Sequence, residues 1–212
     1  MKPPLSVLRK VGVILADYID DLFTINKTHS ACSANVDKII EMLDSLGFVI
    51  HPDKSLFEPT QILEFLGFII NTIEMSLRLT PEKESAIFEL CSEVLNTDLV
   101  SIRKIAKLLG KFASSFMAVP YRKLHYRALE RLKTESLKTY RGNFDKKVQL
   151  TREACSDVMW WKNNIIGSWS PIVRDNPKIE MKTDASSIGW GAAIGEISTG
   201  GPVHYLRTGH TH

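Results

Sequence analysis

The sequence predicts an α+β fold, in which short strands lie toward both ends of the chain and helices lie between them. Short apolar runs bounded by turn-forming residues occur within residues 1–80 and again after residue 178, and such runs are typical of strands. Within residues 82–166, apolar side chains recur with the spacing of amphipathic helices. The first 80 residues suggest the order strand–strand–helix–strand–strand, an α+β layer, and helices follow them.

The first predicted element is a β-hairpin with carboxylates at its tip. Residues 11–15 (VGVIL) form an apolar run typical of a buried strand, and residues 22–26 (LFTIN) continue in a strand-like pattern. The acidic corner ADYIDD at residues 16–21 separates the two runs. We therefore expect its aspartates to lie at the turn.

A helix is predicted next. Asn26 and Thr28 offer capping oxygens before it, and Gly47 stands where a left-handed stop belongs. One apolar stripe supports this helix: Val36, Ile39, Ile40, Leu43 and Leu46. After it, the sequence predicts a short strand at residues 48–50 (FVI), a turn at 51–55 (HPDKS) and a single strand at 64–70 (EFLGFII).

Helices are predicted through the middle of the chain. Thr80, Pro81 and Glu82 form a typical helix start, which predicts a helix over residues 82–95. A second helix is expected from near Asp98, and its apolar face is Ile102, Ile105, Ala106, Leu109, Phe112, Ala113 and Phe116. Helix-like spacing continues over residues 121–147 and again over 149–166.

Beyond a break at residues 175–177, the sequence predicts paired strands. Residues 178–186 (KIEMKTDAS) and 189–195 (GWGAAIG) are both strand-like, and Ser186 and Ser187 form the expected turn between them.

Charge is distributed unevenly along the chain. Residues 1–99 contain 8 Lys and Arg against 15 Asp and Glu, whereas residues 100–150 contain 13 Lys and Arg against 3 Asp and Glu. A compact basic segment is typical of a protein that binds a polyanion, and an acidic segment can collect divalent metal ions. A solvated helical face would produce the same basic pattern, so both interpretations stay open at this point.

Composition excludes several classes of protein. No apolar run approaches the roughly 18–20 residues that span a bilayer, so we expect no membrane partner. The amino-terminal residues lack the features of a signal peptide. Three scattered cysteines, Cys32, Cys91 and Cys155, give neither a disulfide framework nor zinc-ligand spacing. The expected location is intracellular, in the cytoplasm or nucleus, and the sequence does not predict an oligomeric state.

Asp20 and Asp21 are the strongest candidates for chemistry. Two adjacent carboxylates repel each other, and a divalent cation relieves that repulsion. Mg²⁺ prefers one or two carboxylates together with water and substrate phosphates. Such ions support phosphoryl transfer by activating a hydroxyl and stabilising the leaving group. Composition alone would give the string Tyr-x-Asp-Asp roughly 0.01 times in a chain like this one, so an accidental acidic turn is disfavoured.

Residues 18–21 (YIDD) resemble the Tyr-x-Asp-Asp signature in the palm of reverse transcriptases. The resemblance continues in order through LGFVIHPDKS, EFLGFII and TPEK, and then through a helical segment similar to the thumb. The residues before YIDD resemble DIRS-like retrotransposons of the tyrosine-recombinase group. Residues 181–186 (MKTDAS), followed by GWGAAIG, resemble the first strands of a ribonuclease H domain.

The resemblance implies a truncated polymerase palm with a helical thumb, followed by the first strands of a ribonuclease-H-like domain. It divides the chain into a partial palm at 1–80, a thumb and basic helical connection at 81–147, a connection at 148–177 and a truncated ribonuclease-H-like domain at 178–212.

Individual roles follow from the same resemblance. Asp20 and Asp21 would be catalytic metal ligands, and Asp184 would bind metal in the ribonuclease part. Nucleotide or primer contacts would come from Tyr18, Lys54, Leu66 and Gly67. Nucleic acid would be bound by Arg103, Lys104, Lys107, Lys111, Arg122, Lys123 and Arg127. Plain alternatives stay open, since Tyr18 is also an ordinary strand aromatic, Lys54 a solvated turn lysine and Leu66 a core residue.

The resemblance is incomplete at both centres. The family places another metal-binding aspartate on an earlier palm strand, and its ribonuclease site needs further acids downstream. The resemblance therefore implies an RNA-directed DNA polymerase fragment of a retrotransposon polyprotein, which would use Mg²⁺ or Mn²⁺, a primer–template of RNA or DNA and deoxynucleoside triphosphates. We expect it to be inactive alone. The alternatives are a non-catalytic nucleic-acid-binding remnant of a degraded element and an inert remnant.

Overall fold

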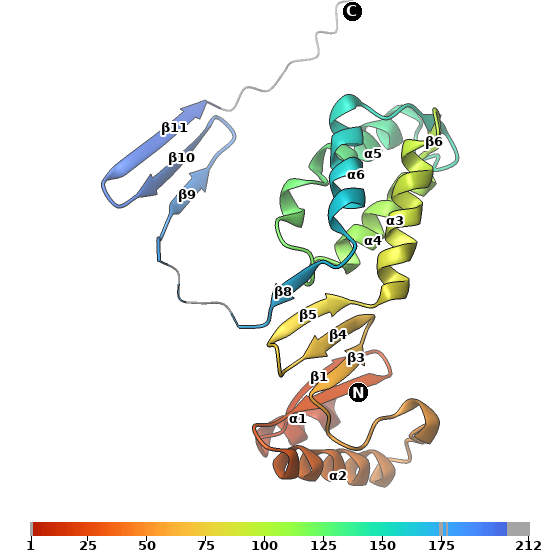
Figure 1. Ribbon diagram of the computed structural model, residues 1–212, viewed down its shortest axis with the longest axis vertical. Coiled ribbons are helices and arrows are strands. Elements are labelled where there is room, and N and C mark those ends of the chain that lie inside the picture. Colours follow the sequence, from red (N-terminus) through yellow and green to blue (C-terminus); the bar gives the residue numbers. More distant parts are fainter. Residues whose placement is uncertain (1, 174–175, 177, 203–212) are drawn as a thin grey trace, which may run out of the picture. The chain divides into compact units, whose positions relative to one another are not determined.

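The computed structural model describes residues 2–173, 176 and 178–202, and Figure 1 shows their helices and strands. The chain divides into two compact units, Met1–Ile172 and Val173–His212, which are described separately. Helices and short antiparallel strands are mixed along the described residues, so the predicted α+β class is confirmed.

The first unit begins with a helix that the sequence did not predict, α1 (Lys2–Lys10). It is followed by the hairpin strands β1 (Ile14–Tyr18) and β2 (Asp21–Ile25), and then by helix α2 (His29–Ser45). A small core joins these elements, and it consists of Leu5, Leu8, Val13, Ile39 and Leu43. The strand predicted to begin at Val11 begins instead at Ile14, because the chain first turns after α1.

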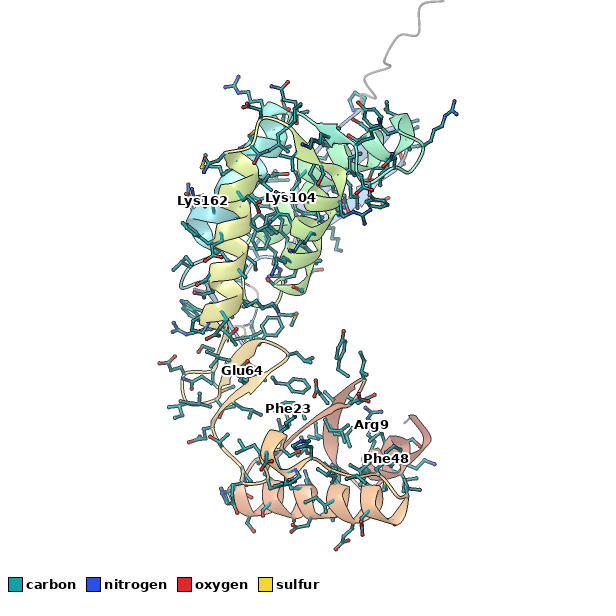
Figure 2. The ribbon with its side chains drawn as sticks, turned by 90° about the vertical axis from the view of Figure 1, so that its right-hand side faces the viewer. Arg9, Phe23, Phe48, Glu64, Lys104 and Lys162 are labelled. Atoms are coloured by element: carbon teal, nitrogen blue, oxygen red, sulfur yellow. The ribbon has the colours of Figure 1, made fainter. Side chains whose placement is uncertain are left out.

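The two ends of α2 follow the predicted signals. At its start, the hydroxyl of Thr28 accepts a hydrogen bond from the Ala31 amide at 3.2 Å. At its end, Gly47 has a φ of +76°, and the amide of Phe48 donates to the Leu43 carbonyl at 3.0 Å. This is the Schellman arrangement, in which a left-handed glycine lets the chain satisfy the last helical carbonyls. Figure 2 labels Phe48 beside this helix end.

Two predictions for residues 48–70 are wrong. Residues 48–50 form no strand, and a 3₁₀ turn, η1 (Pro52–Lys54), follows them. The predicted single strand at 64–70 is a hairpin, made of β3 (Ile62–Phe65) and β4 (Phe68–Asn71). The reason is that Leu66 and Gly67 both have positive φ, at 54° and 72°, and two such residues close a tight two-residue turn.

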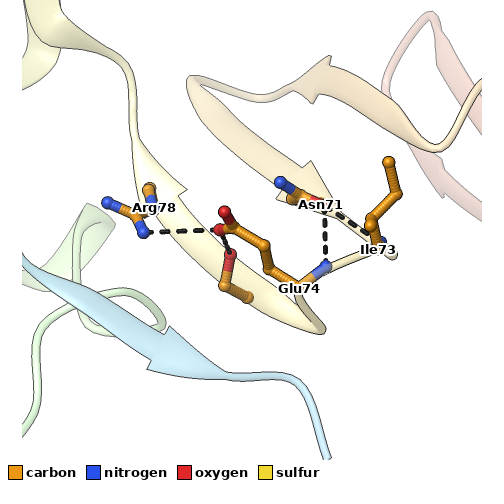
Figure 3. Close-up of polar contacts among 5 residues, drawn as sticks. Asn71, Ile73, Glu74 and Arg78 are labelled. Carbon is orange, nitrogen blue, oxygen red and sulfur yellow. Dashed lines mark hydrogen bonds and ion pairs between the residues drawn. The ribbon is translucent and has the colours of Figure 1, made fainter.

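A four-stranded antiparallel sheet extends this hairpin in the order β3-β4-β5-β8. Strand β5 is Ser76–Leu79, and strand β8 is Trp169–Pro171. Side chains fix the turn between β4 and β5, as Figure 3 shows: the Asn71 carboxamide oxygen accepts from the amides of Ile73 and Glu74 at 2.9 and 3.0 Å. The Glu74 carboxylate in turn accepts from the Ser76 hydroxyl and pairs with Arg78.

A helical segment lies between β5 and β8 in the chain. It contains α3 (Pro81–Leu95), β6 (Val100–Ser101), α4 (Ile102–Ser114), η2 (Arg122–Leu124), α5 (Arg127–Thr139), β7 (Lys147–Val148) and α6 (Arg152–Asn164). Side-chain hydroxyls of Thr80, Ser101 and Thr151 cap α3, α4 and α6. Helix α4 therefore begins later than the predicted start near Asp98, because Val100 and Ser101 pair with β7.

The core of the helical segment is built around Trp161. Its ring stacks on Phe112 with centroids 4.0 Å apart, and its indole N–H donates to the carbonyl of His125 at 2.7 Å. All the predicted core positions of α4 except Ala106, Ala113 and Phe116 are buried, and Leu108 is buried as well. The indole N–H has a partner, as a buried tryptophan requires.

Helix α5 is capped by a residue from another helix. Its own N-cap, Tyr126, makes no capping side-chain hydrogen bond. Asp157 on α6 supplies the acceptor instead, because its Oδ2 accepts from the amides of Ala128 and Leu129 at 2.9 and 3.2 Å. Asp157 is only 8% exposed, so this buried carboxylate joins α6 to the start of α5.

The second unit is an antiparallel sheet of β9 (Lys182–Ala185), β10 (Gly189–Ile194) and β11 (Ile197–Pro202). The predicted pairing of the first two strands is confirmed, and β11 was not predicted. Gly200 is required by close packing, since a Cβ there would lie 2.7 Å from the Trp190 carbonyl oxygen. Residues 175 and 177 of the predicted break lie outside the described residues.

Candidate metal and nucleic-acid site

The tip of the β1–β2 hairpin presents two aspartates to solvent. Tyr18 pairs with Asp21, so Ile19 and Asp20 form the turn. Ile19 has a φ of 55°, a left-handed conformation that strains a β-branched residue. Strain of this kind costs on the order of 1–3 kcal/mol and is concentrated at functional positions. The structure thus places Asp20 and Asp21 at an exposed, strained turn, where the sequence placed them.

The neighbouring Asp17 is electrostatically satisfied. The guanidinium of Arg9, on α1, donates to its Oδ1 at 2.6 Å and to the Leu15 carbonyl at 3.4 Å. Asp20 and Asp21 form no ion pair with any described residue. The hairpin therefore holds two adjacent carboxylates that form no ion pair with a cation of the described residues.

This arrangement fits part of a divalent metal site. Asp20 and Asp21 provide the one or two carboxylates that Mg²⁺ uses when water and phosphates complete its shell. Within residues 2–173, 176 and 178–202, no group of three His, Cys, Asp or Glu side chains could enclose a metal ion. The remaining ligands would have to come from water, a bound nucleotide or residues other than these.

The other predicted contacts of the palm segment lie on separate elements. Tyr18 is 55% exposed at the end of β1, and Lys54 is exposed on the 3₁₀ turn without an acidic partner among the described residues. Phe23 stacks on Phe65 with centroids 5.2 Å apart, and this contact joins the acidic hairpin to β3. Figure 2 labels Phe23 between the two hairpins. The aromatic contact thus links the strand pair carrying the aspartates to the hairpin carrying Leu66.

Leu66 and Gly67 form the tip of the β3–β4 hairpin, and Lys83 of α3 lies against it. The Lys83 ammonium donates to the carbonyls of Leu66 and Ser114, and it lies 4.3 Å from the centroid of the Phe68 ring. Sequence reasoning did not single out Lys83. The one available signal was a cation in the first turn of a helix, where the helix dipole favours anions.

Among the described residues, acidic partners are found for Arg103, Lys104 and Arg127 of the predicted nucleic-acid contacts. Arg103 binds both carboxylate oxygens of Asp145, at 2.9 and 3.2 Å, while Lys104 pairs with Glu93 and Arg127 with Glu130. The hydrogen bond and charge of Asp145 raise the pKa of Arg103, and Arg103 lowers the pKa of Asp145. Exposed pairs of this kind are weak, so phosphate groups can compete for the cations.

The remaining basic residues differ in their surroundings. Arg122 is half-buried, donates to the Val119 carbonyl at 2.9 Å and lies 5.6 Å from the centroid of the Phe116 ring. These contacts are typical of an arginine that stabilises the fold. Lys107 and Lys123 are exposed and Lys111 is half-buried, and none of these three has an acidic partner among the described residues. Of the four cations of α4, Arg103 and Lys107 are exposed, whereas Lys104 and Lys111 are half-buried.

Most aromatic rings near these basic residues pack against other side chains. His125 stacks on Trp160 with centroids 4.1 Å apart, and Tyr126 packs edge-on against Phe116. Tyr121 is 76% exposed and has a φ of 59°. Of these three rings, Tyr121 is the one that remains largely open to solvent.

Asp184 lies in the second unit, on the exposed strand β9 opposite Gly191. Its carboxylate accepts a hydrogen bond from the Ala185 amide at 2.9 Å. Among the described residues, Asp184 belongs to no group of three or more His, Cys, Asp or Glu side chains that could hold a metal ion.

Solved structures of a foamy viral protein resemble this chain. No family model matches the sequence, and no curated protein matches it. The foamy viral protease-reverse transcriptase in complex with an RNA/DNA hybrid matches with a TM-score of 0.61 and 18% identity over 96% of this chain. Its dRH form with double-stranded DNA matches with a TM-score of 0.57 and 19% identity over 90% of this chain. The fold is reverse-transcriptase-like.

This chain spans only part of those proteins. It covers 27% of the chain bound to the hybrid and 31% of the dRH chain. Within the reverse-transcriptase-like fold, one compact unit holds the acidic hairpin tip, the Leu66–Gly67 tip and the basic helix α4. Asp184 belongs to the other unit. No described helix has the length and apolar character that a bilayer-crossing segment needs.

Proposed function

We propose that this chain is part of an RNA-directed DNA polymerase, a reverse transcriptase encoded by a retrotransposon of the DIRS-like group. The intact protein would carry out metal-dependent nucleotidyl transfer. One observation carries the proposal: a strained hairpin tip, inside a reverse-transcriptase-like fold, presents Asp20 and Asp21, and neither forms an ion pair within the part of the chain that the structure describes. A site of this kind is suited to bind a divalent cation beside phosphate groups.

Each proposed role follows from the chemistry of the side chain. Asp20 and Asp21 would hold Mg²⁺ or Mn²⁺, which when bound lowers the barrier to attack by a primer 3′-hydroxyl and stabilises the leaving pyrophosphate. Tyr18, exposed beside them, would contact the primer end or the incoming nucleotide. Lys54 would neutralise charge on the triphosphate. The Leu66–Gly67 tip would position the primer strand.

The proposed substrates are a primer–template of RNA or DNA and deoxynucleoside triphosphates. The basic segment over residues 100–150 supports binding along a phosphate backbone. Neutralising about six phosphates of duplex DNA would make log K fall against log salt with a slope of about −5. Asp184 would bind metal in a ribonuclease-H-like domain. The protein would act in the cytoplasm or nucleus.

Primer extension with Mg²⁺ or Mn²⁺ tests the polymerase proposal. We expect no extension by these 212 residues alone, because Asp20 and Asp21 supply only part of a metal shell. A longer polypeptide that also contains the earlier palm strands should extend a primer, and Asp20→Asn should abolish that activity. Full activity of the Asp20→Asn polypeptide would show that the metal assignment is wrong.

A second candidate is a nucleic-acid-binding module without catalysis, left by a degraded element. Lys107, Lys111 and Lys123 favour it, since they have no acidic partners among the described residues and can contact phosphates directly. Salt-dependent binding of a primer–template, with no extension by any longer polypeptide, would select this candidate. If the chain did not bind a primer–template even at low salt, an inert remnant would be the remaining interpretation.

A further inference from the structure

Lys83 connects two elements that are distant in the sequence. It is the third residue of α3, and its ammonium donates to the Leu66 carbonyl at 3.5 Å and to the Ser114 carbonyl at 3.0 Å. Leu66 forms the tip of the β3–β4 hairpin, and Ser114 is the last residue of α4. One side chain therefore holds the hairpin tip and the carboxyl end of α4 together.

Two further contacts fix the position of the Lys83 side chain. Its ammonium lies 4.3 Å from the centroid of the Phe68 ring, within range of a cation–π interaction. Its Cδ lies 3.1 Å from the point where a Cβ on Gly67 would be. Gly67 thus serves the turn through its positive φ and also leaves room for the lysine stem.

The environment of Lys83 does not favour a cation. Burial, and secondly the charge of Lys111, lower the pKa of Lys83. Its place in the first turn of α3 also opposes the helix dipole. The Lys83 ammonium therefore contributes little to the net stability of the fold. Its hydrogen bonds to the Leu66 and Ser114 carbonyls are better explained by the position that they impose on the β3–β4 hairpin and on α4.

We propose that Lys83 is a positioning residue that fixes the tip of the β3–β4 hairpin against the carboxyl end of α4. The inference rests on the proposed function, because it takes the Leu66–Gly67 tip as the primer contact and α4 as the helix that follows the nucleic acid. Lys83 then sets the distance between the primer end and the duplex contacts. The Leu66 and Ser114 carbonyls are the two points that it joins.

Amide hydrogen exchange of the full 212-residue chain tests this inference. Lys83→Met keeps an unbranched stem beside Gly67 and removes the ammonium, whereas Lys107→Met removes an exposed α4 cation as a matched control. Loss of two charge-assisted hydrogen bonds should speed exchange in residues 62–71 and 112–118 about tenfold or more. Exchange in α6 should not change in either variant.

A conservative variant separates positioning from general destabilisation. Lys83→Arg keeps a cation and N–H donors, so it should preserve most of the protection that Lys83→Met loses. Equal exchange in the wild type and Lys83→Met, or an equal rise in the hairpin and in α6, would overturn the inference. If Lys83→Met does not fold, Lys83→Gln, which is too short to reach both carbonyls, takes its place against Lys83→Arg.

A recessed primer–template duplex added to the same samples separates this inference from the proposed function. In the wild type, bound duplex should slow exchange at residues 62–71 and in α4 together. In Lys83→Met, α4 should stay protected and the hairpin should not. Failure of the wild type to bind duplex would count against the proposed function, while the exchange of the free protein still decides the role of Lys83.

Discussion

Removing the Asp157 carboxylate should destabilise the helical segment more than its single charge suggests. Asp157 is 8% exposed and accepts hydrogen bonds from the Ala128 and Leu129 amides. Asp157→Ala would leave both amides without this acceptor, at a partly buried helix start that has no capping side chain of its own. A hydrogen bond to a charged group contributes about 1.5–3 kcal/mol, and a lost helix cap costs about 0.5–2 kcal/mol. We therefore expect a loss of about 2–4 kcal/mol.

Urea unfolding followed by tryptophan fluorescence measures this loss, since Trp160 and Trp161 lie on α6 with Asp157. Asp157→Asn keeps one neutral acceptor oxygen, so its loss should be about half as large. Asp145→Ala is the matched control, because Asp145 forms an exposed ion pair and should shift the unfolding midpoint little. A midpoint for Asp157→Ala equal to that of the control would refute the capping argument.

Three other predictions concern strain, reactivity and pH. Ile19→Gly should raise stability by about 1 kcal/mol in thermal unfolding, because glycine adopts a φ of 55° without strain; a lower melting temperature would contradict this. Burial raises the pKa of Cys91 to about 12, so iodoacetamide at about pH 8 should label the half-buried Cys32 and Cys155 well before Cys91, as mass spectrometry would show. The pKa of Lys83 is lowered below 10.5, so its destabilising charge is fully present below the lowered value and is relieved as pH rises toward 10.5. The urea midpoint of the wild type should therefore rise relative to that of Lys83→Met as pH approaches 10.5, and a constant difference between the two midpoints would count against this prediction.

Local signals in the sequence predicted the elements that local chemistry controls. Thr28 and Gly47 mark the ends of α2, and Thr80 with Pro81 marks the start of α3, because capping depends on residues within one turn of the helix end. The acidic hairpin tip was predicted for the same reason, since two apolar runs flank it.

The errors arise where residue type gives no local signal. A leucine at positive φ is uncommon, so Leu66–Gly67 was not recognised as a turn, and residues 64–70 were predicted as one strand. Strand β8 was missed because it pairs with β5, far away in the sequence. Helix α1 was missed because its apolar residues Leu5 and Leu8 gain their partners only from α2.

Contacts between elements explain why the candidate site was only partly predicted. The sequence identified Asp20 and Asp21 but could not show that Arg9 neutralises Asp17, since these two residues lie on different elements. It identified seven basic residues but not which of them have acidic partners, because Asp145 reaches Arg103 from across the helical segment. Lys83 was missed because its contact with Ser114 also joins two different elements.

The pairing of β5 with β8 restricts how the helices can move. The chain leaves the sheet after Leu79 and returns at Trp169, and neighbouring strands lie only about 4.8 Å apart. The Glu84 carboxylate, near the departure point, also accepts from the Gly167 amide, near the return point. A segment attached by one end can swing in any direction, whereas one attached at two adjacent points can only rock about the line between them. Any larger excursion of these helices must first separate β8 from the sheet.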